Sequence, residues 1–146
     1  MTTYKGAIKT IADAVTASHV NPPGSGEGSL IHVTADNYEA AAIVQNSLIE
    51  IGSKIPLNGY VYEVILGYDA LGASSSLSVG DAEDPDRYVT NTVTTSAGIT
   101  RLNAVNGLNY NIDETDTTNT DRQVLVSVVD TGAITGTVRC AVLWAK

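Results

Sequence analysis

One stretch of the sequence, from Gly59 to Val93, constrains the fold more than any other. Its first part reads YVYEVILGY, and in an extended chain alternate side chains would give two faces that are both largely apolar. Such a strand fits the middle of a sheet that is covered on both sides for part of its length. Residues 72–76 and 80–86 are rich in Gly, Ser, Asp and Pro, which predicts turns. The stretch therefore predicts three antiparallel strands in one ribbon.

Strand-like segments recur along the rest of the chain at intervals of about ten residues. Outside the ribbon they are Ser29–Thr34, Ser47–Ile51, Leu108–Ile112, Arg122–Val129 and Thr135–Ala145. Two segments are ambiguous. We expect residues 37–44 (NYEAAAIV) to be extended or loop, because they are fewer than an isolated helix needs. Residues 99–105 are either a short strand or a turn of helix.

The last two predicted strands carry matching apolar stripes. The stripes consist of Val124, Val126 and Val128, and of Val138, Cys140, Val142 and Trp144. We expect residues 130–133 to join these strands as a hairpin, and the two stripes to face each other in the core.

The strands follow one another without the strand–helix alternation that a parallel sheet demands. We therefore expect an all-β fold, namely an antiparallel two-sheet β-sandwich of jelly-roll type with an N-terminal arm or short helix. A chain of 146 residues is long enough to form such a domain without disulfides.

The N-terminal part of the chain has a different composition. Residues 22–28 contain two prolines and three glycines, which argues for a linker. We expect residues 1–28 to form an arm and linker, and residues 29–146 to form the sandwich. Apolar residues at helical spacing allow a short helix in the arm, and an extended arm is the alternative. The candidate partner contacts in the arm are Tyr4, Lys5, Ile8, Lys9 and Ile11.

Charge and composition exclude several classes of partner. The formal net charge is −8 with only eight Lys and Arg, which argues against nucleic acid because its binding depends on basic side chains. No apolar run approaches the ~20 residues of a membrane span, and no long apolar segment at the start predicts export. We therefore expect synthesis in the cytoplasm. The single cysteine, Cys140, can form no intrachain disulfide and is expected to be a small core residue.

No residue pattern nominates an active site. His32 lies within a predicted strand and His19 beside the linker, and neither has a nucleophile or carboxylate at a diagnostic spacing. The sequence contains no GxSxG, P-loop, dinucleotide fingerprint or HExxH motif. We expect no enzymatic activity and no cofactor.

Two groups of carboxylates are candidate cation ligands. They are Asp81, Glu83, Asp84 and Asp86, and Asp113, Glu114, Asp116 and Asp121. Calcium accepts several oxygens at flexible angles, but residues 81–86 do not follow the EF-hand order. We interpret the first group as a solvated turn and assign no metal, while leaving calcium binding there open to test.

Residues 29–145 resemble a widespread family of small bacteriophage virion proteins. The resemblance lies in KIPLNG leading into a strand, in YDALG at its end, in LSVGDAEDPDRY at residues 77–88, and in the closing TGTV. Members of this family look like auxiliary head proteins, which cement or decorate the assembled capsid. The resemblance carries no catalytic residues.

The resemblance implies a capsid cement or decoration protein. Such a protein would bind the outer surface of the assembled head and stabilise contacts between subunits of the major capsid protein. It would also associate with itself as a dimer or trimer, and a flexible arm would add contacts through multivalency. The alternative is a carbohydrate-binding or adaptor module of a tail fibre or other appendage, for which exposed tyrosines would serve as sugar platforms.

Overall fold

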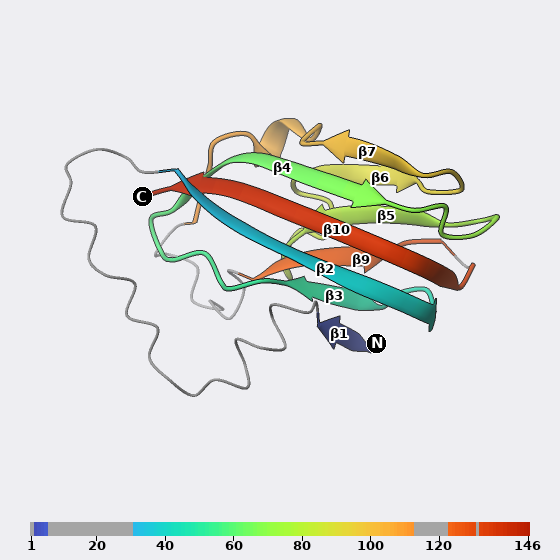
Figure 1. The fold of residues 1–146 in the computed structure, drawn as a ribbon. Coiled ribbons are helices and arrows are strands. Elements are labelled where there is room, and N and C mark those ends of the chain that lie inside the picture. Colours follow the sequence, from blue (N-terminus) through green and yellow to red (C-terminus); the bar gives the residue numbers. More distant parts are fainter. Residues whose placement is uncertain (1, 6–30, 113–122, 131) are drawn as a thin grey trace.

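The computed structural model describes residues 2–5, 31–112, 123–130 and 132–146. These residues form a β-sandwich, as predicted, with two layers of strands packed face to face (Figure 1). Its strands are β1 (Thr3–Lys5), β2 (His32–Ile43), β3 (Leu48–Ile51), β4 (Tyr60–Tyr68), β5 (Ser76–Gly80), β6 (Val89–Val93), β7 (Gly98–Arg101), β8 (Tyr110–Asn111), β9 (Val124–Val128) and β10 (Ile134–Ala145). A 3₁₀ turn, η1, spans Val105–Gly107. None of these described residues forms a helix that is long and apolar enough to cross a membrane.

The strand order defines the two sheets. The first has the order β1-β3-β9-β5-β6, and the second has the order β2-β10-β4-β7, with β8 also paired to β4. The short β1 runs parallel to β3, and the other pairings are antiparallel. Successive strands from β2 to β5 alternate between the sheets, so most connections cross from one layer to the other.

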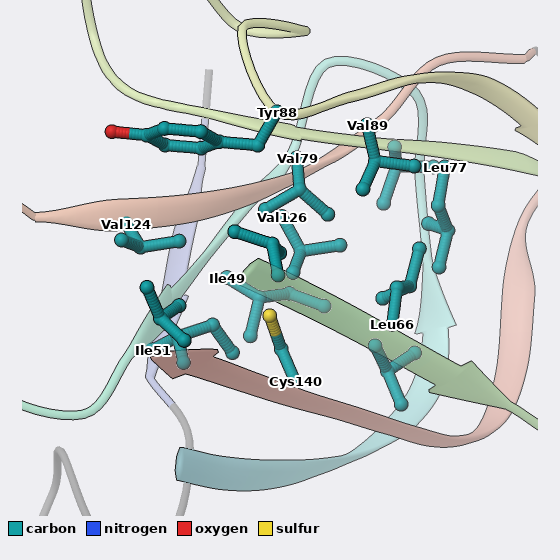
Figure 2. Close-up of a cluster of buried hydrophobic side chains, with 14 of the residues drawn as sticks. Ile49, Ile51, Leu66, Leu77, Val79, Tyr88, Val89, Val124, Val126 and Cys140 are labelled. Carbon is teal, nitrogen blue, oxygen red and sulfur yellow. The ribbon is translucent and has the colours of Figure 1, made fainter. Parts of the chain in front are cut away.

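The core lies between the two sheets. Its two main stripes are the predicted ones, since the valines of β9 and the alternate residues of β10 from Val138 to Trp144 are all buried. Figure 2 shows Cys140 pointing from β10 into a cluster that contains Ile49 and Val126 of the other sheet. The prediction that the stripes face each other is confirmed.

Two predicted pairings are wrong. The strands β9 and β10 belong to different sheets and do not form a hairpin, and β4 and β5 are likewise in different sheets, so residues 59–93 are not one ribbon. The reason is burial. A hairpin would place both apolar stripes on the same face of one sheet, whereas placement in opposite sheets lets each stripe cover the other.

The alternation in β4 shifts at a bulge. Val61 and Val64 are both buried, although strict alternation would place them on opposite faces of the strand. The register against β10 shifts between them, because Leu143 pairs with Glu63 whereas Trp144 pairs with Val61. Tyr62 is therefore left without a partner on β10, and its side chain is exposed. The uniform alternation predicted for this strand is thus interrupted.

The ambiguous segments are resolved. Residues 37–43 are extended and belong to β2, which continues the predicted strand before them through 12 residues. Residues 99–105 contain both alternatives, because β7 ends at Arg101 and η1 begins at Val105. The strand predicted over Leu108–Ile112 is reduced to the two residues of β8.

Candidate functional site

Two described residues with chemically reactive side chains, His32 and Cys140, are both engaged in packing. The His32 ring is exposed and stacks on Trp144, with 4.4 Å between ring centroids. Cys140 is buried, and burial raises the pKa of its thiol to about 12, so the thiol stays protonated and unreactive at neutral pH. The second histidine, His19, lies outside the described residues.

The acidic loop is organised by Asp81. Its Oδ1 accepts hydrogen bonds from the backbone N–H groups of Glu83 (3.1 Å) and Asp84 (2.9 Å), and its carboxylate pairs with the Arg87 guanidinium. The Arg87 guanidinium in turn lies 4.0 Å from the centre of the Tyr110 ring. Among the described residues no group of three or more His, Cys, Asp and Glu side chains is arranged to hold a metal ion. The second predicted acidic group, residues 113–121, lies outside the described residues.

Asp84 and Asp86 lie close together on the same loop. A hydrogen bond to the Asp84 side chain raises the pKa of Asp86, with smaller contributions from burial and from the charge of Asp84. Crowded carboxylates of this kind repel each other, so a cation brought near them would be attracted.

Part of the predicted N-terminal contact set can be placed. Tyr4 and Lys5 belong to β1, which pairs with β3 at the edge of the first sheet. The centre of the Tyr4 ring lies 5.7 Å from the centre of the Tyr38 ring of β2, so the two rings pack between edge strands of the two sheets. The other members, Ile8, Lys9 and Ile11, lie outside the described residues.

The tyrosines divide between core and surface. Tyr88 is buried, and burial raises the pKa of its hydroxyl above the ordinary range. Tyr60 and Tyr62 are exposed by 42% and 45%, on the first part of β4. These two tyrosines are the exposed aromatic side chains that a sugar platform would require.

The outer face of the second sheet contains a hollow, which sequence reasoning did not identify. Two adjacent rows of opposed residues cross β2, β10, β4 and β7 there. One row is Ala35, Ala141, Ile65 and Arg101, and the other is Asn37, Arg139, Gly67 and Ile99. Small residues in the middle of each row leave a hollow of about 510 Å³ between larger neighbours. We call this depression the hollow.

Two arginines flank the hollow. The guanidinium group of Arg101 lies 3.2 Å from the Glu63 carboxylate, and that of Arg139 lies 3.9 Å from the Asp69 carboxylate. Both arginine side chains are about two-thirds exposed, at 66% and 62%. Solvent-exposed pairs of this kind are weak, so each guanidinium can also contact a partner.

A second unpredicted feature is an apolar projection after β7. Val105 is 88% exposed and Leu108 is 58% exposed, and the residues around them, 102–110 (LNAVNGLNY), carry no charge. Backbone N–H groups of Asn103 and Ala104 both donate to the carbonyl of Tyr88, which fixes the loop. We call Val105 and Leu108 together the knob.

The knob lies beside the paired carboxylates of the acidic loop. Asp84, Asp86 and Val105 line the same cavity of about 270 Å³. The knob is anchored at Gly107, where a Cβ would collide with the backbone carbonyl oxygen of Arg87, so the loop can approach this closely only with glycine. The uncharged sequence of the knob did not distinguish it beforehand, because residues 88–100 form a longer uncharged run.

Comparison with known proteins gives a structural likeness. No protein-family model matches the chain, and no curated protein matches it. Solved structures that resemble it include a chain in the cyanophage Pam1 capsid asymmetric unit, which is 24% identical with a TM-score of 0.67 and covers 84% of this chain and 89% of that one. A chain in the capsid of Ralstonia phage GP4 is 20% identical with a TM-score of 0.68 and covers 99% of this chain and 97% of that one. At these identities the likeness shows a shared fold, which extends over nearly the whole length of the GP4 chain.

Proposed function

We propose that the protein is a structural component of a bacteriophage virion, and more specifically a cement or decoration protein. In this role it binds the outer surface of the assembled head and stabilises contacts between major capsid protein subunits. The observation that carries the proposal is the fold shared with a chain of the GP4 capsid over 99% of this chain. The order of the central strands, with β2-β10-β4-β7 facing β3-β9-β5-β6, supports the jelly-roll type.

The described surface suits a binding role more than catalysis. It offers an apolar knob and an apolar hollow, while the described histidine and the cysteine are engaged in stacking and in the core. We therefore propose a protein that acts without enzymatic activity or cofactor and associates with capsid protein and with itself.

Copy number in purified particles tests the proposal. Virions of the phage that encodes the chain should contain hundreds of copies, measured by quantitative mass spectrometry against the major capsid protein. Heads from a deletion strain should lose stability to heat or low salt and regain it when the full-length protein is added. Absence from purified particles, or fewer than about a dozen copies, would contradict the cement role.

The N-terminal arm is proposed to add contacts to the shell. Deletion of residues 1–28 would also remove β1 and the Tyr4–Tyr38 contact, so a sharper variant is the double substitution Ile8→Asp and Ile11→Asp. Co-sedimentation with heads should weaken several-fold while the melting temperature is unchanged. Thr10→Asp is the matched control. Unchanged binding by the double variant would exclude an apolar contact by the arm.

A second candidate function rests on Tyr60 and Tyr62. Their exposure on one strand favours a carbohydrate-binding or adaptor module of a tail fibre. A glycan array separates the two candidates, because saturable binding that is lost in Tyr60→Ala and Tyr62→Ala would favour the module. Absence of binding to any glycan would remove it.

A further inference from the structure

The knob is unusual for the surface of this chain. Val105 is its most exposed large apolar side chain among the described residues, and an ordered loop holds it in place. Exposed apolar side chains that cluster on a rigid loop are typical of contact points between proteins. A formal net charge of −8 makes copies of this chain repel each other, and an uncharged tip reduces that repulsion locally.

The hollow has the complementary shape and chemistry. Its small residues, Ala35, Gly67 and Ala141, leave room for side chains that project from another surface. Ile65 and Ile99 add apolar area on the same rows. The hollow, of about 510 Å³, is open towards solvent, so side chains that project from another molecule can reach it.

The charges beside the two features are opposite. The cavity beside the knob is lined by Asp84, Asp86 and Arg87, and the Arg87 charge is already paired with Asp81. The hollow is lined by Arg139 and by buried Asp36, whose carboxylate accepts two backbone N–H groups, and Arg101 lies on the adjacent row. A guanidinium placed near the crowded carboxylates would relieve the repulsion between them, and an apolar contact would exclude water around the pairs.

We propose that the knob of one copy of this chain inserts into the hollow of a second copy, with Asp84 and Asp86 facing Arg101 and Arg139. Because the two surfaces are different parts of one molecule, the contact is head-to-tail and generates a closed ring or an open chain. Two hollows placed face to face would instead leave the space between them unfilled and bring four arginines together. The proposal rests on the self-association in the proposed function and deepens it, because it names the two surfaces through which copies of the pure protein meet.

Two variants that damage opposite halves of the contact provide the test. Val105→Glu places a charge on the knob, and the native side chain is so exposed that folding should not change. Gly67→Val fills the hollow, and a Cβ at this position would meet Arg139 at an ordinary 3.8 Å. Sedimentation equilibrium of full-length protein should show wild-type oligomers and at least ten-fold weaker self-association for each variant. Val93→Glu, an exposed position outside both surfaces, is the control and should behave as wild type.

Mixing the variants gives the decisive result. The Gly67→Val copy keeps a working knob and the Val105→Glu copy keeps a working hollow, so the mixture should form pairs with a 1:1 composition and nothing larger. Reversal of one charge, in Arg139→Glu, should weaken association, and Arg139→Glu with Asp86→Arg in one chain should restore it. Wild type that stays monomeric at up to about 1 mM would overturn the proposal. The proposal would also be overturned if either variant alone associated as strongly as wild type, or if the mixture failed to pair. Head-binding assays test the capsid role separately from all these outcomes.

Discussion

Gly67 and Arg139 lie opposite each other on β4 and β10, and a Cβ at Gly67 would stand 3.8 Å from that of Arg139. This is ordinary contact, so the fold does not require glycine at this position. Glycine within a strand is less stable than a residue with a side chain, by about 0.5–1 kcal/mol. We expect Gly67→Val to raise the free energy of unfolding by about that amount, measured by urea denaturation.

Gly80 is the matched control for this substitution. It also lies in a strand, but a Cβ there would collide with the backbone carbonyl oxygen of Asp84 and lie 2.5 Å from the Pro85 carbonyl carbon. Gly80→Ala should therefore lower the free energy of unfolding by about 1–3 kcal/mol, as overpacking does. A loss of stability in Gly67→Val as large as in Gly80→Ala would mean that the hollow is already filled.

The second prediction concerns Asp81. Its carboxylate satisfies two backbone N–H groups and pairs with Arg87, and both side chains are only 10–12% exposed. Removal of Asp81 leaves the largely buried Arg87 guanidinium with only the more distant and more exposed Glu83 carboxylate as a counterion. We expect Asp81→Ala to lower the free energy of unfolding by about 2–3 kcal/mol, somewhat less than for a fully buried pair.

Glu83 is the control for Asp81. Its carboxylate lies 3.6 Å from the Arg87 guanidinium, but it is 43% exposed. Glu83→Ala should change the free energy of unfolding by no more than about 0.5 kcal/mol, because exposed pairs contribute little. Equal effects of the two substitutions would show that Asp81 does not organise the loop.

The same geometry predicts the effect of calcium. Asp81 is occupied by backbone N–H groups and by Arg87, and no three acidic side chains among the described residues are arranged to hold a metal ion, so we expect residues 81–86 not to bind calcium. The melting temperature should be the same in excess calcium and in EDTA. A rise of several degrees with calcium that EDTA reverses would identify a cation site that this geometry does not provide.

The fold class could be predicted because burial dictates it. The valines of β9 and the alternate residues of β10 require apolar cover, and the sandwich provides it. The sheet to which each strand belongs could not be predicted. A hairpin and a crossing connection both bury the same stripes in part, and the choice between them depends on packing with distant strands such as β2 and β3.

The candidate surfaces were harder to predict than the core. The hollow depends on the register of four strands that are far apart in sequence, and Ala35, Gly67 and Ala141 have no shared pattern along the chain. The bulge at Tyr62 likewise reverses the faces of β4, which simple alternation does not detect. The knob had no distinctive signal either, because the uncharged run at residues 102–110 is shorter than the uncharged run at residues 88–100.

The fourth prediction measures the packing between sheets. Val126 and Val142 come from opposite sheets and are fully buried. Truncation of either to alanine removes two methyl-sized groups from the core and leaves a cavity, which should lower the free energy of unfolding by about 1–3 kcal/mol. Val93→Ala, at a position 65% exposed, should cost less than about 0.5 kcal/mol. Small effects at both buried positions would contradict the facing stripes.

The last prediction follows from the Cys140 thiol. Burial raises its pKa to about 12 from an ordinary value of 9.0, so the folded state keeps a proton that the unfolded state loses. The free energy of unfolding should therefore fall as the pH rises from about 9 towards 12, with a slope from this group of up to about 1.4 kcal/mol per pH unit. Cys140→Ala should remove the contribution of this one thiol proton to the slope. Buried Tyr88, whose pKa is also raised, contributes to the slope in both proteins. Urea denaturation at several pH values measures the slopes, and a thiol reagent at neutral pH should label Cys140 only after unfolding. Rapid labelling of the folded protein, or equal slopes for the two proteins, would show that the thiol is accessible from solvent.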